Sequence, residues 1–326
     1  MPLDPNIAGL LQMMAAAGTP QLHEQTPEQA RAALRTLMVD LRHPSTLAEV
    51  ASVTETQVAS VPCRVYRPSA DDDSSAPLPT VVYLHGGGFV VGDLDTHEGV
   101  CRRLARDVSA VVVSVDYRLA PEHPFPAAVE DAYAVLRSVA DDLDEYGGDG
   151  DRLVVGGDSA GGNLAAVCAQ LAHADGLTLA AQLLVYPAVD LTGEYPSRTE
   201  NGEGYFLTAA DMEWFAANYT GITGGVDALA DPAVAAVAAD PKLSPLRAAS
   251  LEGLAPAVVA TAEFDPLRDE GDIYAEALSA AGVPVRAQQF AGLIHGFYGL
   301  EQLSPAVEAA TVWINAQLRD LLAHTR

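Results

Sequence analysis

The sequence predicts an α/β fold built on a mostly parallel sheet. Short apolar runs rich in β-branched residues recur along the chain, and segments of helical character separate them. Strands that alternate with helices in this way form βαβ units, in which successive strands run parallel. The chain has 326 residues, of which 49% are hydrophobic and 19% charged, so a large buried core is available, as in ordinary globular proteins.

The expected strands lie at residues 80–84, 110–115, 153–155, 181–186, 257–260 and 285–290. The expected helices lie at 99–108, 127–143, 161–174, 209–219, 270–281 and 305–322. Each expected helix falls between two successive strands or after the last one. This order is the one that a parallel sheet with crossover helices requires.

Two regions fall outside this alternation. Residues 1–48 look helical, and residues 191–250 are rich in Gly, Pro and Asp with one convincing helix. A helical arm and an insertion after a central strand are what a cap over a binding site would look like. We therefore expect a core made of residues 49–190 and 251–326 and a helical cap made of the other two segments.

Ser159 lies where an expected strand passes into an alanine-rich helix, with Gly157 and Gly161 on either side of it. Glycine at both positions permits a sharp backbone turn and leaves the hydroxyl exposed at the carboxyl end of the strand. This pattern is typical of a nucleophile elbow, so Ser159 is the predicted nucleophile. A phosphate-binding or dinucleotide loop is the alternative, but the G-x-G-x-x-G spacing and the P-loop lysine are both absent.

A glycine run, Gly86 to Gly88, follows His85 at the end of the first expected strand. Alone, such a run would more often be a flexible turn. Paired with the elbow, it can aim bare N–H groups at a developing oxyanion. We predict donors at Gly87 and Gly88, with Ala160, directly after the nucleophile, as the third. We expect His85 to hold this loop by hydrogen bonding rather than to act as a base.

A serine hydroxyl needs a base, so one of the eight histidines must approach Ser159. In enzymes with this elbow, the acid follows the nucleophile along the chain and the histidine comes last. His295 fits that order, because it follows the last expected strand and is flanked by Gly292 and Gly296.

The acid should lie between the serine and the histidine, at a strand end. Glu263, Asp265 and Asp269 all follow the expected strand at 257–260. We favour Asp265, because it stands in a turn that Pro266 makes rigid and can orient the imidazole from there. Asp269 resembles an ordinary carboxylate in the first turn of the next helix.

The charge balance excludes several kinds of partner. Lys and Arg number 18 against 44 Asp and Glu, and the net charge of −26 repels nucleic acids and anionic membrane surfaces. No basic leader precedes the first apolar stretch and no apolar run could span a bilayer, so we expect a cytoplasmic protein without a membrane partner. The acidic excess suits either a high-salt cytoplasm or solubility in general.

The three cysteines, Cys63, Cys101 and Cys168, are scattered and lack the spacing of a metal or redox site. We expect them to be buried as small hydrophobic side chains, and we expect no bound metal.

Together these motifs resemble the hormone-sensitive-lipase-like branch of the α/β hydrolases, the bacterial family IV esterases. The matching segments are HGGG at 85–88, DYRLAPE at 116–122, GDSAG at 157–161, DPLRD at 265–269 and HGF at 295–297. Asp158 is the residue that places the chain in the GDSAG group. Phe89 stands where this family often has tryptophan, which leaves the reaction type untouched.

The resemblance implies an α/β-hydrolase fold with a mostly parallel eight-stranded sheet, flanking helices and a helical cap. It also implies a serine carboxylesterase that hydrolyses short to medium acyl esters through an acyl-enzyme, with a small-molecule ester as its partner and no cofactor. Asp158 and residues 117–122 would be scaffolding, and homodimers are frequent in the family. Amide, peptide or lactone hydrolysis by the same triad remains an alternative, as does a non-catalytic ligand-binding role.

Overall fold

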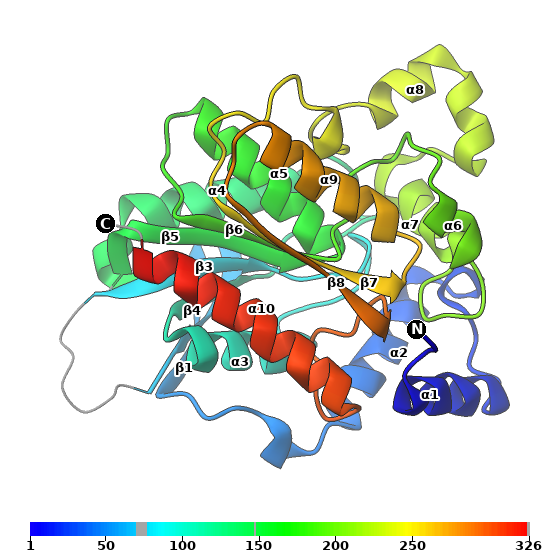
Figure 1. The fold of residues 1–326 in the computed structure, drawn as a ribbon, viewed down its shortest axis with the longest axis horizontal. Helices are drawn as coiled ribbons and strands as arrows, with labels where there is room; N and C mark the ends of the chain where they lie inside the picture. The colour runs from blue at the N-terminus through cyan, green and yellow to red at the C-terminus, as the bar shows by residue number, and fades with distance from the viewer. Residues whose placement is uncertain (70–76, 147, 325–326) are drawn as a thin grey trace.

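A single eight-stranded sheet forms the centre of the computed structural model, which describes residues 1–69, 77–146 and 148–324. The order of the strands across the sheet is β1-β2-β4-β3-β5-β6-β7-β8 (Figure 1). Their bounds are β1 (Ser52–Val58), β2 (Val61–Arg67), β3 (Leu78–Leu84), β4 (Val111–Val115), β5 (Gly148–Asp158), β6 (Ala181–Val185), β7 (Ala257–Phe264) and β8 (Val285–Ile294). β2 pairs antiparallel with β1 and β4, and the pairs from β4 to β8 are parallel.

The predicted α/β class and the mostly parallel eight-stranded sheet are confirmed. The apolar runs did not reveal the hairpin of β1 and β2, because most side chains of β1 are exposed and polar. The two strands are joined by Ala59 and Ser60, which have φ values of 50° and 68°. Two-residue hairpin turns of this left-handed type usually contain Asn or Gly. This turn contains neither, so its residues did not predict a hairpin.

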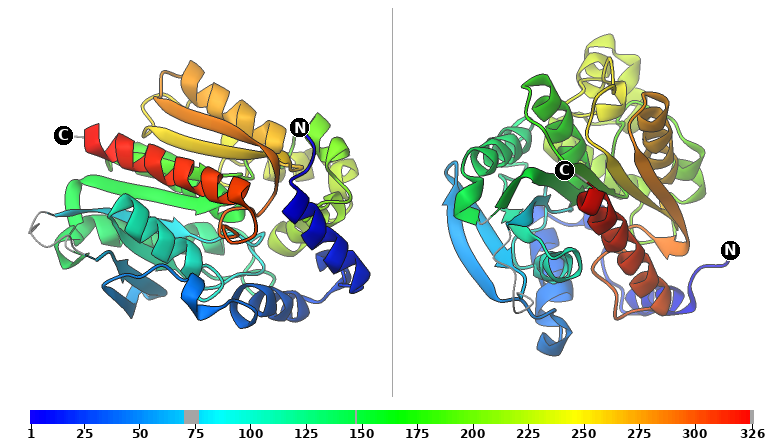
Figure 2. Two further views of the ribbon diagram at one scale, coloured as in Figure 1. Left: turned by 60° about the horizontal axis from the view of Figure 1, so that its bottom comes forward. Right: turned by 60° about the vertical axis from the view of Figure 1, so that its left-hand side comes forward.

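The helices form a layer on each face of the sheet (Figure 2). α4 (Ala127–Asp141), α5 (Ala160–Ala174) and α9 (Arg268–Ala280) cover one face, and α3 (Glu98–Val108) and α10 (Pro305–His324) cover the other. All five were expected from the sequence. α10 shows the reason: Val307, Ala310, Ile314 and Leu318 recur at helical spacing and are all buried against the sheet, whereas Val312 is 48% exposed.

The other helices gather beyond the carboxyl ends of the parallel strands (Figure 1). They are α1 (Pro5–Ala16), α2 (Pro27–Arg35), α6 (Pro196–Glu200), α7 (Ala209–Thr220) and α8 (Pro232–Ala238). Thr26 and Thr208 form capping boxes that fix the starts of α2 and α7. Only α7 was expected in the 191–250 segment, because α6 and α8 are too short to produce a clear helical pattern.

The two ends of the 191–250 segment lie next to each other. A guanidinium nitrogen of Arg247 lies 2.5 Å from a carboxylate oxygen of Asp190. The backbone N–H of Leu191 donates to the hydroxyl of Ser244 at 2.8 Å. These contacts pin the two ends of the insertion side by side at the edge of the core.

In the part of the chain that the structure describes, no helix is both long and apolar enough to cross a membrane. The three cysteines are free and buried. Burial raises the pKa of Cys63 and Cys101 to about 12, so both thiols are protonated and unreactive at neutral pH.

Replacing Ile314 with Ala should destabilise the fold by about 2–5 kcal/mol, because the lost side chain leaves a cavity between α10 and the sheet. Urea unfolding followed by circular dichroism measures the change. The matched control is Val312→Ala on the exposed face of the same helix, which should change stability by no more than about 0.5 kcal/mol. Equal effects of the two substitutions would contradict the assignment of these faces.

Candidate active site

Ser159 sits between β5 and α5 in a sharp turn, with φ of 55° and ψ of −118°. A positive φ is strained for a residue with a side chain, and such strain is typical of a nucleophile elbow. The neighbouring glycines are needed because the backbone after β3 passes very close. A Cβ added at Gly157 would lie 2.4 Å from the carbonyl oxygen of Leu84, and one added at Gly161 would lie 1.9 Å from the same atom.

The structure brings the predicted nucleophile, base and acid together. Nε2 of His295 lies 2.9 Å from Oγ of Ser159, and Nδ1 of His295 lies 2.8 Å from Oδ2 of Asp265. Asp265 directly follows β7 and His295 directly follows β8, which are neighbours in the sheet. The carboxyl ends of parallel strands share one edge, so residues far apart in the chain meet there.

Asp265 is fully buried, and its second carboxylate oxygen accepts the N–H of Leu267 at 2.8 Å. A carboxylate held in this way can fix the tautomer of the imidazole and stabilise its protonated form. The other two acid candidates are engaged elsewhere. Glu263 binds the N–H of Gly292 and the terminal amino group, while Asp269 binds Arg268 and the backbone N–H of Ser197.

The predicted oxyanion donors lie on neighbouring elements, the loop after β3 and the first residue of α5. Gly87 and Gly88 have φ values of 117° and 58°, in the region that favours glycine. The carbonyl of Gly87 accepts the N–H groups of Val90 and Val91, which folds the loop back on itself. Ala160 is the first residue of α5, where the N–H is free of the helical ladder and the helix dipole favours negative charge.

Asp158 ties the elbow to this glycine loop. Its Oδ1 accepts the N–H of Gly86 at 3.0 Å and the hydroxyl of Tyr83 at 2.7 Å. Burial opposes ionisation, but His97 and the Tyr83 hydroxyl keep the pKa of Asp158 below its usual value. The carboxylate adjoining the nucleophile therefore holds the loop next to it. Neither Tyr83 nor His97 was singled out in the sequence, since no motif marks them.

His85 lies under the loop as a neutral side chain. Burial, and then the nearby His97, lower the pKa of His85 to about 4. Its Nδ1 lies 2.7 Å from the carbonyl oxygen of Gly86, and its ring stacks on Tyr117 at 4.2 Å between centroids. The Tyr117 hydroxyl donates to the carbonyl of His85 at 2.7 Å. These contacts suit a support for the loop, and it is His295 that lies within hydrogen-bond distance of the Ser159 hydroxyl.

Aromatic side chains that the sequence did not mark also surround the site. The Tyr186 ring lies 4.6 Å from the His295 ring. Phe215 of α7 packs so tightly on Gly88 that an added Cβ there would lie 2.1 Å from the ring. Phe206 similarly approaches Gly296, at 3.4 Å from an added Cβ. Both phenylalanines belong to the 191–250 segment, in which no motif could be aligned.

Among residues 1–69, 77–146 and 148–324, no group of three or more His, Cys, Asp or Glu side chains is arranged to hold a metal ion. The side chains around Ser159 combine a hydroxyl, a base, an orienting carboxylate and a loop of bare N–H groups. These are the groups that acyl transfer requires.

Comparison with known proteins defines the class. Residues 81–299 match the profile of a family described as having the alpha/beta hydrolase fold. The chain belongs to this family, which confirms the resemblance drawn from the motifs.

The individual proteins that are similar to this chain include ester hydrolases. The carboxylic ester hydrolase LipN of Mycobacterium tuberculosis is 47% identical over 79% of this chain and 66% of its own length. An ethyl acetate hydrolase of Pseudomonas putida is 35% identical over 99% of this chain and 100% of its own. Among solved structures, a hyperthermophilic esterase from the archaeon Pyrobaculum calidifontis superposes with a TM-score of 0.87 at 41% identity, covering 98% of this chain and 99% of that one.

Replacing Gly161 with Ala should lower both stability and turnover, because the new Cβ forces the loop after β3 away from the elbow. Overpacking of this kind costs about 1–3 kcal/mol. Thermal unfolding and steady-state kinetics measure the two effects. The control is Gly150→Ala, where an added Cβ meets nothing within 4 Å and neither quantity should change. Full turnover in Gly161→Ala would argue against a functional contact between elbow and loop.

Proposed function

We propose that Ser159, His295 and Asp265 are the catalytic triad of this carboxylic ester hydrolase. One observation supports the assignment above the others: His295 lies within hydrogen-bond distance of both partners, with Nε2 toward the hydroxyl and Nδ1 toward the carboxylate. That is the order of contacts that turns a weak alcohol nucleophile into a strong one.

In the proposed reaction, His295 takes the proton of the Ser159 hydroxyl as Oγ attacks the carbonyl carbon of the ester. The N–H groups of Gly87, Gly88 and Ala160 stabilise the negative oxygen of the tetrahedral intermediate. When that intermediate collapses, His295 gives the proton to the leaving alcohol, and the acyl group stays on Oγ.

Water completes the cycle. His295 removes a proton from a water molecule, whose oxygen attacks the acyl carbon. The second intermediate releases the carboxylic acid as the proton returns to Oγ of Ser159. Throughout, Asp265 keeps the Nδ1 proton in place and offsets the positive charge that forms on the ring.

We further propose that residues 1–48 and 191–250 form a cap over a core of residues 49–190 and 251–326. The pinned ends of the insertion and the position of its helices beyond the strand ends support this division. Phe215 and Phe206 extend from the cap onto the oxyanion loop and the segment after His295. Because Phe215 fills the space beside Gly88, we propose that the substrates are esters with short to medium acyl chains.

Ser159→Ala should reduce kcat by about 10⁴ to 10⁶-fold on a p-nitrophenyl ester, because the acyl-enzyme can no longer form. Wild-type activity should also fall toward acid pH, since a general base must be neutral to accept a proton. Thermal unfolding checks that the variant is folded, and organophosphate labelling of wild type checks that Oγ is the reactive group. Retained turnover in the folded variant would overturn the assignment.

Phe215→Ala should raise kcat/KM for an octanoate ester relative to a butyrate ester by about 10-fold, because it opens space beside Gly88. A series of p-nitrophenyl esters of increasing acyl length measures the ratio. The control is Val237→Ala in α8, a side chain 46% exposed in the same segment, which should leave the ratio unchanged. An unchanged ratio in Phe215→Ala would place the acyl chain elsewhere.

A further inference from the structure

The loop that holds Asp265 is fixed largely by residues of the proposed cap. We call residues 263–267, which run from the last two residues of β7 to the start of α9, the acid loop. The side-chain amide of Asn201 donates to the carbonyl oxygens of both Glu263 and Asp265, at 3.1 Å each. The Ser197 hydroxyl donates to the carbonyl oxygen of Pro266 at 2.9 Å. Cap side chains therefore satisfy backbone carbonyls on either side of the catalytic carboxylate.

The same serine also joins the cap to the start of α9. Its backbone N–H donates to Oδ2 of Asp269 at 2.8 Å, and the N–H of Asp269 donates back to its hydroxyl at 3.2 Å. This reciprocal pair resembles a capping box formed between two distant segments. It also shows what Asp269, the acid candidate that was not favoured, does in the structure: its carboxylate holds the cap.

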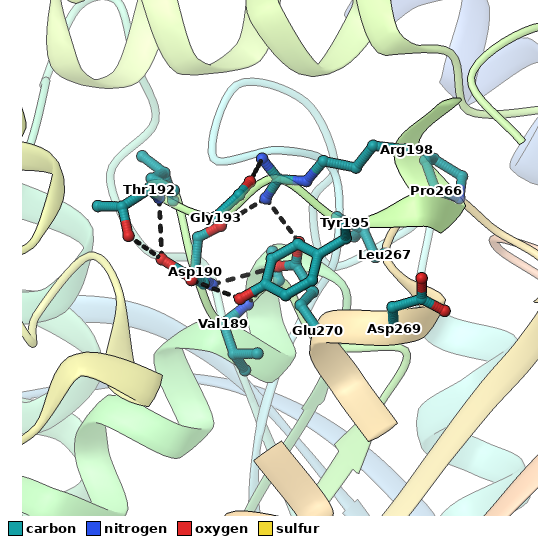
Figure 3. A network of polar contacts seen from close by, with 12 residues as sticks. Val189, Asp190, Thr192, Gly193, Tyr195, Arg198, Pro266, Leu267, Asp269 and Glu270 are labelled. Carbon is teal, nitrogen blue, oxygen red and sulfur yellow. Dashed lines mark hydrogen bonds and ion pairs between the residues drawn. The ribbon is translucent and has the colours of Figure 1, made fainter. Parts of the chain in front are cut away.

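A buried ion pair reinforces the junction (Figure 3). Glu270 is only 1% exposed, and its Oε2 lies 2.6 Å from a guanidinium nitrogen of Arg198 in α6. Its Oε1 accepts the N–H groups of Val189 and Asp190, where the insertion leaves the core. The same guanidinium donates to the carbonyls of Asp190 and Gly193. Glu270 thus connects α9, the stem of the insertion and α6.

These contacts couple the cap to the acid loop energetically. Burial raises the pKa of Glu270, and Arg198 opposes that shift by stabilising the charged form. Moving α6 away would leave the buried carboxylate of Glu270 without its cation and the carbonyl of Pro266 without its side-chain donor, and both losses oppose the displacement. A displaced α6 would therefore draw the acid loop with it rather than separate from it.

We infer that Asn201, Ser197 and the Arg198–Glu270 pair are positioning residues, through which the cap sets the place of Asp265 against His295. This inference rests on the proposed triad. It gives the cap a part in the chemical step in addition to covering the substrate. None of these residues touches the reacting atoms; they act on the geometry of the hydrogen bond between Asp265 and His295.

A role confined to attaching the cap makes a different prediction. If the contacts only kept the cap in place, their loss would raise KM or lower the melting temperature and leave the chemical step intact. If they position Asp265, their loss lowers kcat, since a shift of about 1 Å at a catalytic group can cost about 100-fold in rate. The acid limb of the pH profile should also move to lower pH, because the protonated imidazole loses support from the carboxylate.

The experiment uses the full-length enzyme and a p-nitrophenyl butyrate substrate. Asn201→Ala removes both donations to the acid loop, and Arg198→Met removes the ion pair. We expect each to reduce kcat by about 10 to 100-fold with KM changed by less than about threefold. Arg198→Lys keeps the charge beside Glu270 and should recover part of the loss.

The matched control is Arg103→Met in α3. Arg103 is as well buried as Arg198, with 16% against 19% of its side chain exposed, and it pairs with Asp107 and Glu308 far from the acid loop. Its loss should lower the melting temperature and leave kcat and the pH profile unchanged.

A folded Asn201→Ala enzyme with wild-type kcat and pH profile would overturn the inference, even if Arg198→Met failed to fold. So would an equal loss of kcat in Arg103→Met. Failure of the proposed triad would be seen separately, as activity that survives in Ser159→Ala.

Discussion

The catalytic end of this protein depends on how closely the backbone after β3 approaches the turn between β5 and α5. The carbonyl of Leu84 leaves no room for a side chain at Gly157 or Gly161, so both positions require glycine. Asp158 then bridges the remaining gap by accepting the N–H of Gly86. This close contact places the turn that carries Ser159 beside the glycine loop, from which the proposed N–H donors come.

The rest of the sheet places the other partners around that space. β6, β7 and β8 continue the parallel order from β5, so the residues after β7 and β8 reach the same edge as the elbow. Asp265 and His295 were predictable from the sequence because each directly follows a strand with a clear apolar pattern. Motifs at strand ends reveal function well, since the fold alone brings such positions together.

Other features could not be predicted, because they depend on contacts between distant segments. Asn201 and Ser197 lie in a short helical stretch without a motif, and their partners are 62 to 72 residues further along the chain. Asp269 has the local pattern of a helix start, and only the fold reveals its partner in α6. The strand β1 escaped detection for a local reason, since four successive residues, Thr54 to Gln57, are exposed and polar and give no apolar run.

The joined ends of the insertion have an evolutionary consequence. Because Asp190 and Arg247 hold the two stems together, a longer or shorter segment between them would cost little extra loop-closure entropy. Lineages could then exchange this segment and change substrate preference without rebuilding the sheet. The contacts with the acid loop limit that freedom, since a grafted segment must also supply a donor for the carbonyl of Asp265 and a cation for Glu270. Chimeras whose grafted segment lacks these two groups would have a new pocket and a lower kcat.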